Sequence, residues 1–97
     1  MRLSETYVHT IKAKAKEIFG RSTKIYLFGS RIDDSKRGGD IDLLILPENG
    51  TDESNKINKF YTHLLLNLGI QKIDIIVKRE NELRPIVASA LNTCIEL

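Results

Sequence analysis

The chain has 97 residues, of which 41% are hydrophobic and 29% charged, and its formal net charge is +2. A chain of this length buries roughly 60 to 70% of its unfolded surface and has no room for a second module, so we expect a single domain over residues 1–97. The basic residues are spread along the chain among acidic ones, unlike the clustered lysines, arginines and aromatics of a nucleic-acid surface. We therefore do not expect nucleic acid as a direct substrate.

The sequence predicts a cytoplasmic protein that has no contact with a membrane. No apolar run approaches the length of a membrane span, and the N-terminal residues are too polar for a signal peptide. The one cysteine, Cys94, excludes an intramolecular disulfide and a thiolate metal cluster. It lies in an apolar segment without a histidine close in sequence, which favours a small packed residue over a nucleophile.

The first predicted element is a helix over residues 4–19, where apolar side chains recur at helical spacing. Ser4 is a suitable N-cap, and Glu5 suits the positive end of the helix dipole. Gly20 ends the helix.

The most informative segment is residues 24–46, which read KIYLFGSRIDDSKRGGDIDLLIL. The apolar residues 25–28 predict a buried strand, and Gly29 and Ser30 predict a tight turn after it. A polar, glycine-containing loop then leads to a second apolar strand, which begins with Asp40.

Asp40 and Asp42 share one face of this second strand, because side chains alternate between the two faces along a strand. Two like charges about 4 Å apart repel by roughly 4 kcal/mol at an effective dielectric near 20, so a positive group is expected beside them. Carboxylate oxygens with no nearby thiolate or paired histidines suit Mg²⁺ or Mn²⁺ rather than zinc. The pair therefore predicts a metal site.

A second helix and a third strand follow the turn at residues 47–50. The helix is capped by Thr51 or Asp52, runs to about Leu68, and is long enough to cross back over the sheet. A right-handed crossover places the strand at residues 71–77 parallel or mixed beside its neighbours.

Asp74 lies on one face of the third strand, together with Lys72. If this strand neighbours the one that carries Asp40 and Asp42, three carboxylates converge on one patch. Such a patch beside a Gly-Ser turn fits a metal-bound triphosphate, because metals bridge phosphate oxygens and the turn offers backbone N–H groups and a hydroxyl.

A final helix is predicted from Leu83 or Pro85 to Cys94. Its apolar stripe consists of Ile86, Val87, Ala90, Leu91 and Ile95. This stripe either packs on the sheet or forms a protein interface, and the sequence favours neither. Together the elements predict an α/β (α+β) fold, a small mixed β-sheet with helices packed on it.

The motif at the centre of the chain resembles that of a known superfamily. Gly29-Ser30, nine intervening residues and Asp40-x-Asp42, with a later strand aspartate at position 74, resemble the signature of the DNA polymerase β-like nucleotidyltransferases. LFGSR and GDIDLL in particular resemble the minimal nucleotidyltransferase (MNT) proteins of bacteria and archaea. The resemblance covers most of the chain, from the first strand through Val77.

The resemblance implies a polymerase β-like core that uses a nucleoside triphosphate, ATP, with two Mg²⁺ ions, or Mn²⁺ in their place. It implies that Asp40 and Asp42 hold both ions. It implies that Asp74 binds the catalytic ion and orients or deprotonates the attacking hydroxyl, and that Gly29 and Ser30 hold the terminal phosphates.

Arg31 is among the basic side chains nearest the turn. It either contacts the triphosphate or acceptor, or pairs with Asp33 or Asp34 to hold the loop.

Proteins of the group that this chain resembles are often encoded beside HEPN ribonuclease toxins, and some silence the toxin by transferring AMP from ATP to a toxin tyrosine. The resemblance therefore implies a type VII antitoxin whose partner is a HEPN-family toxin or another helical protein. Two alternatives stay open. One is a non-catalytic antitoxin that neutralises its partner by binding, and the other is transfer to a small molecule, such as an aminoglycoside, by an oligomer whose neighbouring subunit completes the site.

Overall fold

The computed structural model describes residues 3–29, 40–48, 53–79 and 82–97. The helices and strands follow one another as α1 (Glu5–Phe19), β1 (Lys24–Phe28), β2 (Ile41–Leu46), α2 (Glu53–Leu68), β3 (Ile73–Val77), α3 (Pro85–Thr93) and β4 (Ile95–Glu96). The four strands form one sheet in the order β3-β2-β1-β4, in which β1 is antiparallel to β2 and β4, whereas β2 and β3 are parallel. The predicted α/β class, a mixed sheet with packed helices, is confirmed.

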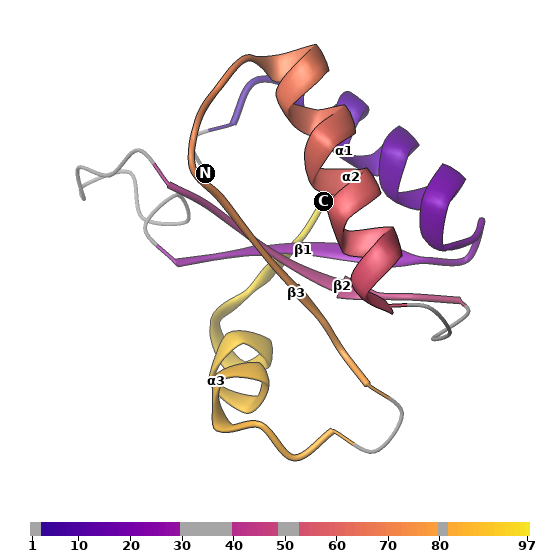
Figure 1. Ribbon diagram of the computed structural model, residues 1–97. Helices are drawn as coiled ribbons and strands as arrows, with labels where there is room; N and C mark the ends of the chain where they lie inside the picture. Colours follow the sequence, from indigo (N-terminus) through magenta and orange to yellow (C-terminus); the bar gives the residue numbers. More distant parts are fainter. Residues whose placement is uncertain (1–2, 30–39, 49–52, 80–81) are drawn as a thin grey trace.

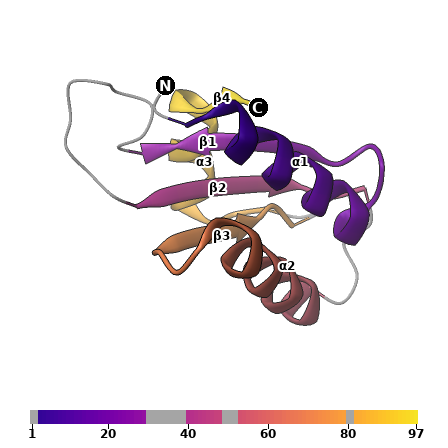
Figure 2. The same ribbon diagram turned by 90° about the horizontal axis from the view of Figure 1, so that it is seen from above.

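The helices divide between the two faces of the sheet. Helices α1 and α2 lie side by side on one face and α3 lies on the other (Figure 1, Figure 2). Phe19 of α1 meets Phe60 of α2 edge to face, with ring centroids 5.7 Å apart. Within the described ranges no helix is both long enough and apolar enough to cross a bilayer.

The predicted start and end of α1 are confirmed. The Ser4 hydroxyl accepts a hydrogen bond of 3.2 Å from the backbone N–H of Tyr7, as an N-cap does. Gly20 follows the helix with a φ of 115°, a value that favours glycine. The predicted N-cap of α2, Thr51 or Asp52, lies outside the described residues.

Helix α2 makes the crossover between the two parallel strands, β2 and β3. Its apolar side faces the sheet, where Phe60 and Leu64 are fully buried. The crossover brings β3 into register with β2, so that Ile41 pairs with Ile73 and Ile45 with Val77. The chain therefore places residues of β3 directly beside those of β2, as the sequence predicts.

Helix α3 uses only part of its apolar stripe to cover the second face. Val87 and Ala90 are buried against Leu44 of β2. Ile86 and Leu91 are 53% and 41% exposed. Packing on the sheet thus holds for Val87 and Ala90. Ile86 and Leu91 face outward, and their part in a protein interface stays a prediction.

The chain leaves the helix earlier than its apolar pattern predicts. Ile95, expected on the stripe of the last helix, lies instead in β4, because α3 ends at Thr93 and the backbone then becomes extended. It pairs with Leu27 on the open edge of β1, and the N–H of Leu97 donates to the carbonyl of Ile25 at 2.9 Å. Pairing with a distant strand therefore overrides the local helical pattern.

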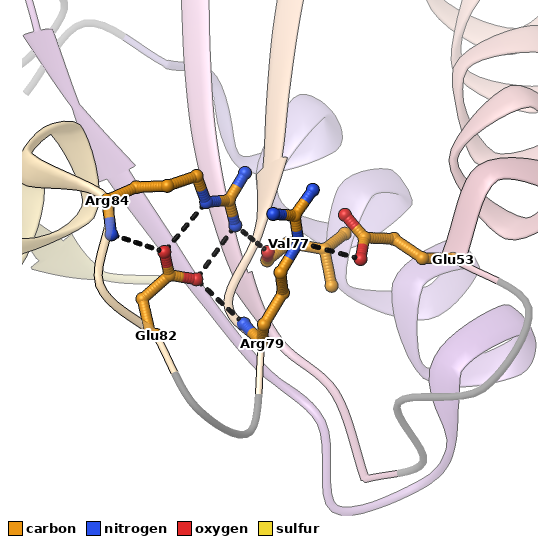
Figure 3. Close-up of polar contacts among 5 residues, drawn as sticks. All are labelled: Glu53, Val77, Arg79, Glu82 and Arg84. Atoms are coloured by element: carbon orange, nitrogen blue, oxygen red, sulfur yellow. Dashed lines mark hydrogen bonds and ion pairs between the residues drawn. The ribbon is translucent and has the colours of Figure 1, made fainter.

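A polar network links residues at the end of β3 to residues at the start of α3 (Figure 3). The Glu82 carboxylate, only 7% exposed, accepts hydrogen bonds from Arg84 at 2.7 and 2.8 Å and from the backbone N–H of Arg79 at 2.9 Å. Arg84 also donates to the carbonyl of Val77 at 2.6 Å, and Arg79 forms an ion pair of 3.4 Å with Glu53. The hydrogen bonds from Arg84 are the main reason that the pKa of Glu82 lies far below its usual range. The network ties the start of α3 to the end of β3 and so fixes where α3 crosses the sheet.

Candidate functional site

Two carboxylates face the same side of the sheet on neighbouring strands. In β2 the side chains of Ile41 and Leu43 enter the core beneath α1 and α2, so Asp42 between them points to the opposite face. In β3 Asp74 follows the buried Ile73 in the same way. Asp42 and Asp74 are register partners in the parallel pair, which sets their side chains next to each other.

Helix α3 packs on the face of the sheet that carries Asp42. It contacts Leu44, the next residue of β2 whose side chain points to that face. Asp42 is consequently half-buried, whereas Asp74 is exposed. The acids therefore lie at the end of the sheet where β2 and β3 begin.

Gly29 closes over Asp42 from the neighbouring strand. Phe28, the last residue of β1, is the register partner of Asp42, and Gly29 follows it with a φ of 81°. A Cβ at this position would collide with Oδ2 of Asp42 and lie 3.0 Å from its Cγ. Only glycine lets the backbone turn this close to the carboxylate.

The surroundings of Asp42 oppose its negative charge. Burial is the largest cause that raises the pKa of Asp42, from 3.8 to about 6. A hydrogen bond shared with Asp74 and the charges of Asp74 and Asp40 act in the same direction, whereas Lys72 opposes them. Within the described residues, Lys72 therefore does not cancel the negative charge around Asp42.

Lys72 pairs with the remaining acid. Its Nζ lies 3.4 Å from Oδ2 of Asp40, and the two side chains are 68% and 46% exposed. The carbonyl of Lys72 accepts a hydrogen bond of 3.2 Å from the N–H of Ile41, which holds the two strands together at this end. A hydrogen bond to Asp40, followed by the charges of Asp40 and Asp74, raises the pKa of Lys72.

A comparison with protein families accounts for this arrangement. The family model described as nucleotidyltransferase domain matches residues 8–97, a range that includes β1 to β4 and all three acids of the site. The chain belongs to this nucleotidyltransferase family. A search of curated proteins and a search of solved structures returned no match.

The chemistry of the nucleotidyltransferase family is transfer of a nucleotidyl group, and the donor set suits the divalent cation that such transfer uses. Asp42 and Asp74 offer hard oxygen donors side by side. Burial is the main reason that the pKa of Asp42 is raised, and a cation relieves the repulsion from Asp74 and Asp40 that adds to it. Asp40 contacts Lys72, and within the described ranges no three carboxylate, histidine or cysteine side chains are grouped so as to hold a metal ion. The residues thus fit a cation at the Asp42 and Asp74 pair, with Asp40 as a nearby third donor held in an ion pair.

Two predicted phosphate-binding residues, Ser30 and Arg31, lie outside the described residues. Gly29 lies directly against Asp42, and its contact with the phosphates stays a prediction. The sequence places Lys72 on the same face as Asp74 but predicts no role for it. The sequence signal that could have indicated a role for Lys72 is its spacing from Asp74. A lysine two residues before an aspartate in a predicted strand lies on the same face as that acid.

Proposed function

We propose that this nucleotidyltransferase transfers AMP from ATP to a hydroxyl acceptor, with Mg²⁺ held by Asp42 and Asp74 and completed by Asp40. The observation that carries the proposal is the register of Asp42 with Asp74 on adjacent parallel strands beneath Gly29. This register gives two neighbouring carboxylates on one face of the sheet, beside a backbone turn at Gly29, which has no side chain of its own. We further propose that Ser30 and Arg31 continue the turn and contact the phosphates.

The transfer forms a bond between the acceptor oxygen and the α-phosphorus, and it breaks the bond from that phosphorus to the leaving pyrophosphate. When bound, Mg²⁺ neutralises charge on the phosphate oxygens and lowers the pKa of an attacking hydroxyl. Asp74, the more exposed acid of the pair, accepts the proton of that hydroxyl. Asp42, half-buried and beside Gly29, keeps a fixed position and orients the nucleotide.

We propose that the acceptor is a tyrosine of a helical HEPN-family toxin and that the chain acts as its type VII antitoxin. The resemblance of LFGSR and GDIDLL to minimal nucleotidyltransferases supports this proposal. The exposure of Asp74 also supports it, because a protein side chain can reach this carboxylate.

The test is the intact mass of the helical partner after incubation with this protein, ATP and Mg²⁺. We expect the partner to gain one or more AMP units, and the gain to vanish with Asp40→Asn and with Asp42→Asn. Glu17→Gln is the matched control, since it removes one carboxylate from an exposed ion pair on α1 and should leave the gain unchanged.

A stable complex without a mass gain would overturn transfer to this partner and leave neutralisation by binding. A gain that persists in Asp42→Asn would overturn the assignment of the acidic pair. Mass gain on a small alcohol instead of the partner would identify a small-molecule acceptor.

A further inference from the structure

A lysine lies among the acids of the candidate site. Lys72 lies directly before β3, two residues before Asp74, and its carbonyl accepts a hydrogen bond from the N–H of Ile41 at the start of β2. Its ammonium group contacts Asp40, which is itself two residues before Asp42. The ammonium group thus occupies the acidic face on which the proposed function places a cation.

The contact between Lys72 and Asp40 has opposite consequences for two ligands of the site. A bare divalent cation competes with the ammonium group for the oxygens of Asp40 and is repelled by its charge. A cation that arrives with a triphosphate brings net negative charge, which three carboxylates repel and an ammonium group attracts. Lys72 is largely exposed, so its flexible side chain is free to exchange Asp40 for a phosphate oxygen.

We propose that Lys72 is a specificity-determining residue, which makes the site reject a bare divalent cation and accept the cation–nucleotide complex. The inference rests on the proposed function, because it assumes that the acids receive a metal-bound triphosphate. Before the complex binds, the ammonium group pairs with Asp40. When the complex binds, the same group leaves Asp40 and contacts a phosphate oxygen.

The first test measures two affinities of the whole protein and of Lys72→Met, without any acceptor. Mn²⁺ alone is titrated by electron paramagnetic resonance, and α,β-methylene-ATP is titrated with Mg²⁺ by calorimetry. Removal of the ammonium group should tighten Mn²⁺ binding about three- to tenfold and weaken binding of the nucleotide analogue by a similar factor. A change of opposite sign in the two affinities distinguishes a selective charge from simple damage to the fold, which lowers both.

Two matched variants control for the change of net charge. Lys59→Met removes an exposed lysine from α2, which lies on the other face of the sheet, and should alter neither affinity. Lys72→Arg keeps the charge and should retain both affinities within about twofold.

A double variant tests whether the effect acts through Asp40. In an Asp40→Asn background Lys72→Met should change Mn²⁺ affinity by less than in the parent protein, because the shared carboxylate is gone.

Parallel changes of the two affinities in Lys72→Met would overturn the inference, as would values equal to those of Lys59→Met. Failure of both the parent and Lys72→Met to bind Mn²⁺ would also overturn it, since there would be no cation to exclude. The proposed transfer has its own readout in the mass of the partner. Opposite changes in affinity without a mass gain would leave the role of Lys72 standing and refute the acceptor.

Discussion

Replacing Asp42 by asparagine should make the protein more stable at neutral pH, although it removes a residue of the candidate site. Asparagine has the same shape and carries no charge, and its amide donates a hydrogen bond to Asp74 as only the protonated form of Asp42 does. The pKa of Asp42 is about 6 in the folded chain against 3.8 for the isolated side chain, so folding disfavours its ionised form. This penalty is absent well below pH 3.8, grows as the pH rises, and is complete above pH 6.

The size of the penalty follows from the difference in pKa. At about 1.4 kcal/mol per pKa unit, the rise to about 6 corresponds to about 3 kcal/mol. Asp42 is only half-buried, and solvent screening reduces this figure to about 1 to 2 kcal/mol. For a domain of this length such a gain raises the melting temperature by roughly 5 to 10 °C.

The assay is thermal unfolding by circular dichroism with a chelator present, at pH 4.0 and pH 7.5. Asp42→Asn should melt well above the parent protein at pH 7.5, and the difference should shrink towards zero at pH 4.0. Glu17→Gln is the matched control, and its exposed ion pair predicts a small change at both pH values. A lower melting temperature for Asp42→Asn at pH 7.5, or a difference that does not depend on pH, would refute the electrostatic reasoning.

Three other substitutions test other parts of the fold, each measured by chemical or thermal unfolding. Gly29→Ala should destabilise the protein by about 1 to 2 kcal/mol from backbone conformation alone, and by more because its Cβ meets Asp42; unchanged stability would contradict the turn geometry. Leu44→Ala, beneath α3, should cost about 2 to 5 kcal/mol, and a smaller loss would mean that α3 packs loosely. Glu82→Gln should lower the melting temperature at neutral pH. Because the fold depresses the pKa of Glu82 below 4.5, this loss should disappear only in strong acid, and a loss confined to alkaline pH would contradict the Arg84 pairing.

The alternation of side chains along a strand accounts for what the sequence predicts well. The order of residues alone places Asp42 on the face opposite Ile41 and Leu43, and the fold has these residues on opposite faces. The length of α2 and the handedness of crossovers predict a neighbouring strand, parallel or mixed, that carries Asp74, and in the fold this strand is parallel to β2. Local chemistry, such as a capping serine, likewise predicts the start of α1.

The features that the sequence does not reveal depend on contacts between distant segments. The two-residue strand at Ile95 has no periodicity to detect and exists because β1 offers an open edge. The pairing of Lys72 with Asp40 joins the starts of two strands and depends on their register. An apolar stripe also does not show which of its residues pack inward, because that choice depends on how Arg84 and Glu82 anchor α3.

The parallel pairing of β2 with β3 also has a kinetic consequence. Strands β1 and β2 are neighbours in the sequence, whereas Asp42 and Asp74 come together only after the crossover through α2 has closed. A partly folded chain that contains only the β1 and β2 pair carries one member of the acidic pair and lacks the other. A bound divalent cation should therefore slow unfolding and leave the rate of folding nearly unchanged, since it stabilises contacts that form late.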